Sequence, residues 1–334
     1  MKFHLTCIAV LLVSMTLFAT EALSWTVTGT GITECQDEDG QKINCPQPGQ
    51  SCFGQDANYT RPAQTYNLGD TAAVVDPHTN LTWQRNDDDI QRAWQEAKDY
   101  CAALRINDQS DWRLPSIREL ETTVDFKCAN NLCINVTAFP NTELHGSYWT
   151  ATDDSVDSGK AWIVTFAGGT SVAGDKSGSA FTRCVSGASL SSGPYSTANG
   201  VVSDAATGLM WEQADSDAGL TWSDALAYCQ SRTTGGYEDW RLPNIRDLES
   251  IVDFSRNTPA LPTAFTVTNP GLWFWTGSPY SIDNWSDAHA YGISIELGYT
   301  DYLSGNGIHA LCVRGGLLVT STVPPLDLLL LSDE

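Results

Sequence analysis

The chain has 334 residues, with 18 Lys and Arg against 40 Asp and Glu and a formal net charge of −22. Its length suits two domains of ordinary size with additional segments. The acidic excess and the lack of a Lys or Arg cluster exclude nucleic acid and anionic membrane as expected partners, because both would be repelled. Acid-rich loops are compatible with bound calcium, but acidic residues more often only keep an exported protein in solution.

The first segment has the form of a secretory signal peptide. A short basic start precedes the apolar run 5–18, and small residues follow ahead of Trp25. The run is too short to span a membrane, and the apolar stretch 326–331 near the end of the chain is shorter still. We therefore expect residues 1–24 to be removed during export to the periplasm, the cell surface or the medium.

Residues 25–72 form a cysteine-containing extension without a helical period. Turn-forming Pro, Gly and Asn residues are frequent in it. We expect an irregular segment, tied by a disulfide, that leans on the first domain. The simplest pairing joins Cys35 to Cys45 across a tight turn, which leaves Cys52 free or intermolecular.

Each of the two copies in the rest of the chain is predicted to open with a β-hairpin, whose turn holds Asn80 or Gly208 at positive φ. A helix follows, capped in the second copy by Thr221 and Asp224. A second helix and short β-rich runs complete each copy. This order predicts an α+β fold in which each domain has two helices and an antiparallel sheet. The expected boundaries are a first domain at 73–187, a linker at 188–200, a second domain at 201–316 and a tail at 317–334.

The repeat is clearest at the second helix of each copy, where DWRLPSIREL at 111–120 returns as DWRLPNIRDL at 239–248. In both copies a Ser or Asn precedes the apolar periodic run and has an acid three residues later, which is the pattern of an N-cap with a capping box. The apolar spacing predicts that the helix continues to about Phe126 or Phe254, with one face in the core.

The cysteines beyond the signal peptide are expected to form disulfides, because export places them in an oxidising compartment. Two cysteines of the first copy have counterparts at the same places in the second, so we pair each set within its own copy. A neighbouring pair found only in the first copy would staple a local loop. No CxxC or His-rich spacing supports zinc. The expected bridges are Cys35–Cys45, Cys101–Cys184, Cys128–Cys133 and Cys229–Cys312.

Several short motifs are spaced along the second copy and return, with changes, in the first. They are TGLMW at 207–211, WSDA at 222–225, DWRLP at 239–243, FWT at 274–276 and CVR at 312–314. This series resembles the Lcl C-terminal domain family, and the likeness covers about residues 30–316. The resemblance implies tandem domains similar in fold to C-type lectins and to formylglycine-generating, sulfatase-modifying enzymes. It also implies adhesion to sulfated glycans, whereas the acidity of this chain favours a neutral glycan or a protein surface.

Ligand sites are expected in the loops that differ between the copies. Two such loops of the second copy combine aromatic rings, which stack on sugars, with carboxylates and amides, which bind hydroxyls or calcium. Trp285 is the strongest candidate, because no helical or strand period requires a core residue there; a loop anchor is the alternative. The nearest acids in the first copy are Asp153, Asp154 and Asp157. The predicted ligand-binding residues are Tyr280, Asp283, Asn284, Trp285, Asp287, His289, Asp301 and Tyr302.

The repeated Trp-Arg pairs, 112–113 and 240–241, are expected to be a core Trp and a buried, paired Arg, because both lie between helices. No GxSxG elbow, HExxH or P-loop occurs, and His145, His289 and His309 are expected to be ordinary surface or loop residues. The sequence therefore predicts an exported, non-catalytic protein that binds a glycan or protein ligand, with calcium as the one cofactor considered. The alternative is an enzyme related to formylglycine-generating proteins.

Overall fold

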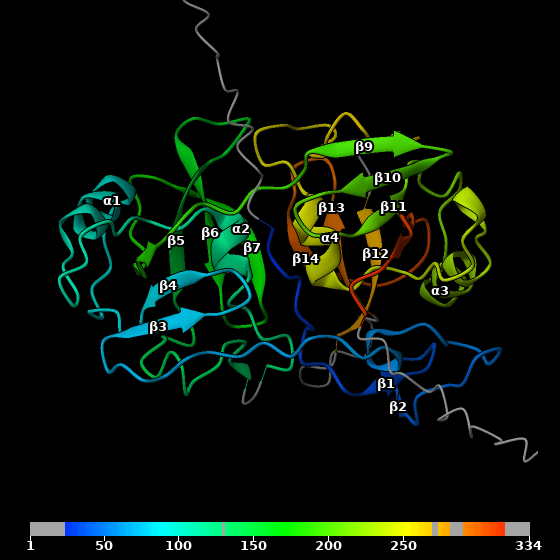
Figure 1. Ribbon diagram of the computed structural model, residues 1–334, viewed down its shortest axis with the longest axis horizontal. Coiled ribbons are helices and arrows are strands. Elements are labelled where there is room, and N and C mark those ends of the chain that lie inside the picture. The colour runs from blue at the N-terminus through cyan, green and yellow to red at the C-terminus, as the bar shows by residue number, and fades with distance from the viewer. Residues whose placement is uncertain (1–23, 129–130, 269–272, 281–289, 318–334) are drawn as a thin grey trace, which may run out of the picture.

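The structure is a computed structural model that describes residues 24–128, 131–268, 273–280 and 290–317. The predicted signal peptide, except Ser24, and the predicted tail, except its first residue, lie outside them. Figure 1 shows two halves side by side, one carrying the strands and helices of the first repeat and the other those of the second.

Each repeat contains the predicted order of a hairpin, two helices and a β-meander. The first repeat consists of β3 (Ala73–Asp76), β4 (Leu81–Gln84), α1 (Trp94–Ala103), α2 (Ile117–Glu121), β5 (Ser147–Asp153), β6 (Lys160–Thr165), β7 (Thr170–Asp175) and β8 (Val185–Ser186). The second consists of β9 (Tyr195–Ala198), β10 (Val201–Asp204), β11 (Met210–Glu212), α3 (Trp222–Gln230), α4 (Ile245–Ile251), β12 (Trp273–Pro279), β13 (Ala290–Ser294), β14 (Thr300–Leu303) and β15 (Val313–Arg314). The hairpin turns have φ of 57° at Asn80 and 72° at Gly208, as predicted.

The largest sheet is shared by the two repeats. Its strand order is β12-β13-β14-β7-β6-β5, and β7 pairs antiparallel with β14 where Ser171 lies opposite Thr300. Each repeat also has a smaller sheet of its own, β3-β4-β8 or β15-β11-β10-β9. The α+β class and the antiparallel pairing were predicted, but the junction of the two sheets was not, because each repeat's pattern describes only its own strands.

Equivalent residues of the two repeats contact each other across this junction. Phe126 of the first repeat packs edge-on against Tyr291, with ring centroids 4.9 Å apart. Its counterpart Phe254 packs against Trp162 at 5.0 Å. The same contact made in both directions is the signature of a two-fold interface. All four rings belong to one hydrophobic cluster that runs through both halves.

The helices α2 and α4 are crossed by two arginines that bond to the backbone of the opposite repeat. Arg118 donates to the carbonyl of Val252 at 2.6 Å, and the equivalent Arg246 donates to the carbonyl of Val124. Both helices end sooner than predicted, at Glu121 and Ile251. Each helix ends in tighter turns, because the N–H groups of residues 122–124 and of Val252 bond to carbonyls three residues back. The arginine of the other repeat bonds to carbonyls in and beyond these turns.

The predicted N-caps are present. The Ser116 and Asn244 side chains each accept the backbone N–H three residues on, and the acid there bonds back to the cap, so both capping boxes are confirmed. Thr221 also caps its helix, but the Asp224 carboxylate bonds the Thr221 hydroxyl at 2.8 Å, and no bond to the cap N–H forms. Only half of that predicted box exists.

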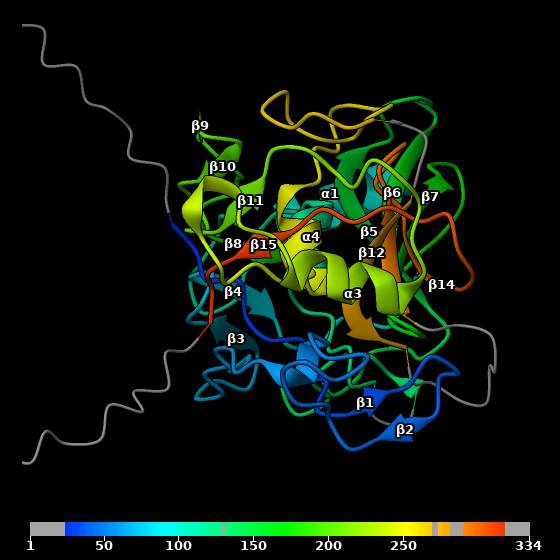
Figure 2. The same ribbon diagram turned by 90° about the vertical axis from the view of Figure 1, so that its right-hand side faces the viewer.

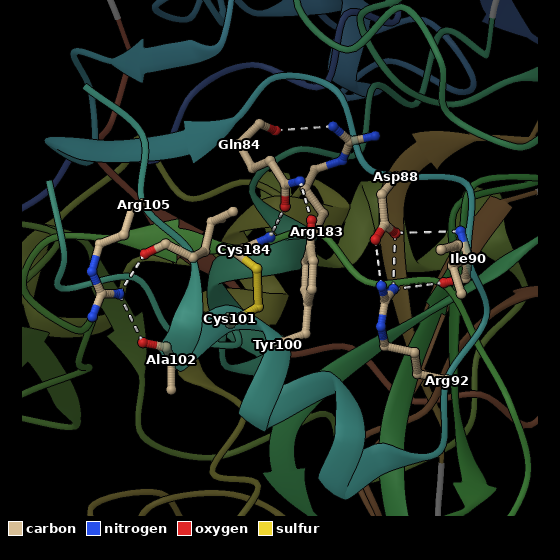
Figure 3. The surroundings of a disulfide bond; sticks show 11 residues. Gln84, Asp88, Ile90, Arg92, Tyr100, Cys101, Ala102, Arg105, Arg183 and Cys184 are labelled. Carbon is tan, nitrogen blue, oxygen red and sulfur yellow. Dashed lines mark hydrogen bonds and ion pairs between the residues drawn. A yellow bond between two sulfur atoms is a disulfide. The ribbon is translucent and has the colours of Figure 1, made fainter. Parts of the chain in front are cut away.

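All four predicted disulfides are confirmed. Figure 3 shows the bridge from Cys101 on α1 to Cys184, which precedes β8. Beside it, the Gln84 side chain accepts the Cys184 N–H at 3.1 Å and donates to the Tyr100 hydroxyl at 2.8 Å. The long bridges therefore fasten the first helix of each repeat to that repeat's last strand. Within the described residues the remaining cysteine is Cys52, which is buried and unpaired.

We predicted that the N-terminal extension leans on the first domain. The structure shows instead that it contacts both repeats. Its hairpin of β1 (Cys35–Gln36) and β2 (Lys42–Ile43) lies beside the second repeat (Figures 1 and 2), where the Gln36 amide donates to the Tyr280 carbonyl at 2.9 Å. The start of the extension touches both halves, because Thr26 donates to the carbonyl of His78 in the first repeat and Trp25 to that of Ala206 in the second. It therefore straddles the junction between the repeats.

Replacing Cys229 and Cys312 by Ser should lower the free energy of unfolding by about 2 to 5 kcal/mol, because the unfolded chain regains the entropy of a loop spanning 83 residues. Urea denaturation followed by Trp fluorescence measures the loss. The matched control removes Cys128–Cys133, which spans only 5 residues, and should cost less. Equal losses would contradict this explanation.

Candidate functional site

The structure describes three of the predicted ligand-binding residues. Tyr280 and Tyr302 stack with ring centroids 4.5 Å and planes 23° apart. Tyr280 is 9% exposed and is therefore a packed residue. Asp301 lies at the surface and accepts the Tyr302 N–H at 2.8 Å. The residues outside the described part are Asp283, Asn284, Trp285, Asp287 and His289.

In the first repeat, the acids that correspond to this loop already have bonding partners within the protein. Asp153 pairs with Lys176 at 2.5 Å, and Asp154 and Asp157 accept backbone N–H groups of their own turn. They form no cluster directed at a ligand. Within the described residues, no group of three or more His, Cys, Asp or Glu side chains is placed to hold a metal ion. Calcium binding by the second-copy loop stays a prediction.

A groove of about 600 Å³ lies beside α3 in the second repeat, and its walls include several acids. His309, predicted to be an ordinary surface or loop residue, is instead buried, with Nδ1 3.0 Å from Asp215 in the groove wall. Asp215 also accepts the N–H and hydroxyl of Thr268. Glu212 accepts a hydrogen bond from Arg232 at 2.8 Å. These carboxylates hold loops together, so the groove offers few free polar groups.

Both Trp-Arg pairs have a buried Trp and a paired Arg, as predicted, but Arg113 of the first repeat is partly exposed and only Arg241 is buried. In the second repeat Trp240 is 1% and Arg241 2% exposed. Arg241 donates to Asp247 at 2.7 Å and to the Gly315 carbonyl at 3.0 Å. Burial lowers the pKa of Arg241 to about 10, which still leaves it charged at neutral pH. Arg61 of the extension donates to the other oxygen of Asp247, so one carboxylate anchors two segments.

A cavity of about 390 Å³ opens where the extension meets the two repeats, and we call it the seam cavity. Its volume lies in the range of small-molecule sites. The extension is held there because Phe126 donates its N–H to the carbonyl of Thr30 at 3.0 Å. The side chains that could contact a ligand come from three distant segments. The walls include Thr30, Thr33, Tyr59, Thr60, Ala63 and Tyr66 of the extension, Thr123, Asp125 and Asn135 of the first repeat, and Arg246 of α4.

Asp125 and Asn135 are among the polar side chains of the seam cavity that keep a free hydrogen-bonding atom. Asp125 uses Oδ1 to accept the Lys127 N–H, and Asn135 uses Oδ1 to accept backbone N–H groups of its own turn. Among the described residues, Asp125 Oδ2 and Asn135 Nδ2 have no partner. The antiparallel Val124–Ile134 bridge places both residues next to it, on paired segments of the chain. An acceptor and a donor in one cavity can bind hydroxyl groups.

The donor atoms of the two arginines of the seam cavity are not open to a ligand. Arg61 is bonded to Asp247, and Arg246 is bonded to Thr28, Gln64 and the backbone of the first repeat. Their remaining guanidinium nitrogens are buried away from the open space. The cavity therefore presents Tyr rings, hydroxyls, a carboxylate and an amide. Sequence reasoning missed this site because no single motif contains its walls.

A groove of about 500 Å³ separates residues 48–53 from α3, and Cys52 lies in its wall. Its thiol is 6% exposed. Burial raises the pKa of Cys52, and the nearby Glu38 and Asp37 raise it further, although a bond from Ser51 opposes them. The thiol is therefore protonated and unreactive at neutral pH.

Two parts of the sequence match a family model described as the Lcl C-terminal domain, at residues 72–186 and 200–314. Together they cover more than half of the chain. The chain belongs to the Lcl C-terminal domain family. The two predicted copies of the Lcl C-terminal domain are thus confirmed, while a search of curated proteins finds no match. Among the described residues of this Lcl C-terminal domain protein, no helix is long and apolar enough to cross a membrane.

Arg241→Ala in the second Lcl C-terminal domain should lower stability by about 1 to 3 kcal/mol, because it removes a buried charge-assisted bond while Asp247 keeps only Arg61. Chemical denaturation measures this loss. The control Arg105→Ala removes an exposed Arg and should be nearly neutral. A variant that melts like the parent but loses ligand binding would show that Arg241 is a ligand contact.

A thiol titration distinguishes a binding protein from the alternative, a cysteine-dependent enzyme. The native protein should react slowly with a disulfide reagent at pH 7 and faster as the pH rises, because deprotonation of Cys52 creates the nucleophile. Unfolding without reductant should reveal one thiol per mature chain, and Cys52→Ser should abolish it. Two reactive native thiols would argue for the enzyme.

Proposed function

We propose that this protein is an exported, non-catalytic binding protein that captures a glycan through C-type-lectin-like domains. Membership of the Lcl C-terminal domain family in two copies supports a binding role. Four disulfides support export, because such bonds persist in oxidising compartments such as the periplasm, the cell surface or the medium. The helix-to-last-strand bridge in each repeat is the feature expected of the lectin-like fold.

The observation that carries this proposal is the seam cavity. Its Tyr59 and Tyr66 side chains offer aromatic surface, and Asp125 and Asn135 offer a free acceptor and a free donor. Rings combined with carboxylate and amide groups suit a hydroxylated ligand, which stacks on one and bonds to the other. The acidic chain favours a neutral sugar over a sulfated one.

Protein recognition by the second-copy loops is the second candidate. The stacked pair Tyr280 and Tyr302 beside the exposed Asp301 supports it, since stacked aromatic side chains form a rigid base for a contact surface. The enzymatic alternative has less support. It requires a reactive cysteine pair, and the cysteines common to both repeats are joined as structural bridges.

A blocking substitution tests the seam cavity. Ala63 is exposed and lies in the cavity wall, so Ala63→Trp should fill the space without disturbing the core. We expect this variant to keep its melting temperature and to bind the best ligand of a neutral-glycan array at least about 10-fold more weakly, which is about 1.4 kcal/mol. Calorimetry measures the affinity, and repeating the array with a chelator tests calcium.

Ala103→Trp is the matched control, because Ala103 is also exposed but lies at the end of α1, outside the seam cavity. It should bind like the parent. If Ala63→Trp also binds like the parent, the ligand does not enter the seam cavity and the tyrosine pair of the second repeat becomes the site to test. If no glycan binds and a protein partner does, the glycan proposal is wrong.

A further inference from the structure

Two glutamates occupy the same place in the two repeats and meet where these pack together. Glu121 ends α2, and Glu249 lies in α4. Each is nearly inaccessible to solvent, at 3% and 6% exposure. Buried glutamates are rare unless they are paired with a cation or fully hydrogen-bonded. This pair therefore calls for a physical account.

The two side chains line one small cavity between the helices. Its volume is about 20 Å³, enough for a single water molecule. Arg118 and Arg246 form part of the same wall, and residues 25–28 of the extension cover it. The cavity thus lies between the equivalent helices of the two repeats, at the point where the extension meets both of them.

Neither glutamate is neutralised by an ion pair within the described residues. Arg118 donates instead to the backbone carbonyls of Glu249, Ser250 and Val252. Arg246 is committed to Thr28, Gln64 and the Val124 carbonyl. Both carboxylate oxygens of Glu121 lack a hydrogen-bond partner.

Hydroxyls from the shared sheet give the pair little further support. Thr300 of β14 reaches Glu249 at 3.4 Å, a weak contact, while Ser171 of β7 lies near Glu121. Tyr291 of β13 is the remaining titratable neighbour, and the charge of Glu249 raises its pKa further after burial. The surroundings therefore supply hydroxyls, a phenol and two arginines whose donors bond elsewhere, and no acid–base ion pair among the described residues.

We propose that Glu121 and Glu249 form a pH-sensitive joint between the two repeats, tightly packed while the pair holds its protons and loosened when both side chains ionise. Two buried carboxylates this close repel each other when charged, and water reaches them poorly. Ionisation would therefore favour separation of α2 from α4. The β7–β14 pairing would weaken with it, because its paired residues Ser171 and Thr300 lie beside Glu121 and Glu249.

The direction of the pH effect follows from where the protons reside. Burial raises the pKa of Glu121 to about 8 from an ordinary 4.5, against the opposing charge of Arg118. Burial, and then the charge of Glu121, raises that of Glu249 well above its usual value. The folded protein thus holds protons that the unfolded chain releases. The contribution of this pair to stability is fully present below about pH 4.5. It is lost as the pH rises to about 8 and beyond.

The test compares the full mature chain with its Glu121→Gln/Glu249→Gln variant, which keeps the shape of both side chains and cannot ionise. Melting temperatures are measured from pH 5 to pH 9 at constant ionic strength. The wild type should lose several degrees as the pH rises, and the double variant should lose much less. The control Glu143→Gln/Glu238→Gln replaces two exposed glutamates and should follow the wild type.

Equal pH slopes in the wild type and the double variant would overturn the proposal. If the double variant does not fold, amide hydrogen exchange of the wild type decides. After correction for the intrinsic effect of pH, exchange in α2, α4, β7 and β14 should be faster at pH 9 than at pH 6, while exchange in the β3–β4 hairpin should be unchanged. Unchanged exchange in the four interface elements, or an equal rise everywhere, would equally reject the joint.

Discussion

The crossed arginines between α2 and α4 are the interaction on which the rest of the architecture depends. Arg118 and Arg246 each satisfy carbonyls that the opposite repeat leaves open at the end of its helix. An open carbonyl in this apolar setting would cost free energy, so each repeat needs the other to complete its backbone hydrogen bonding. This mutual requirement sets the relative position of the repeats, and with it the register of β7 and β14 in the shared sheet.

A second constraint is the single carboxylate of Asp247. It accepts from Arg241 of its own repeat and from Arg61 of the extension, and it also caps α4. Two cations around one buried acid, with further carbonyl acceptors, explain how a strongly acidic chain holds arginines in its interior. Because Arg61 is one of them, the extension is an integral part of the core. The seam cavity exists only because the extension is fixed there.

The sequence was informative wherever the decisive pattern lay within one repeat. The caps at Ser116 and Asn244, the turn at Asn80 and the four disulfides all depend on local spacing or on a position shared by both copies. Three features could not be read in this way. The crossed arginine bonds involve both repeats, the shared sheet depends on one strand pair, and the buried His309 bonds to Asp215 far away in the chain.

The candidate site was predicted less well than the fold, and for the same reason. Loops that differ between copies pointed to residues around Trp285, most of which lie outside the described part of the chain. The seam cavity instead has walls from the extension, the first repeat and α4, and each contributes residues that look unremarkable in the sequence. Only their meeting places the side chains of Asp125 and Asn135 in one cavity with the tyrosines of the extension.

The two-fold contacts within one chain also determine how this protein responds to dilution. Phe126 with Tyr291 and Phe254 with Trp162 form an interface that, between separate molecules, would dissociate as concentration falls. The short covalent connection from β8 to β9 makes the same association intramolecular, with an effective concentration set by its length. The paired arrangement of the repeats is therefore independent of protein concentration.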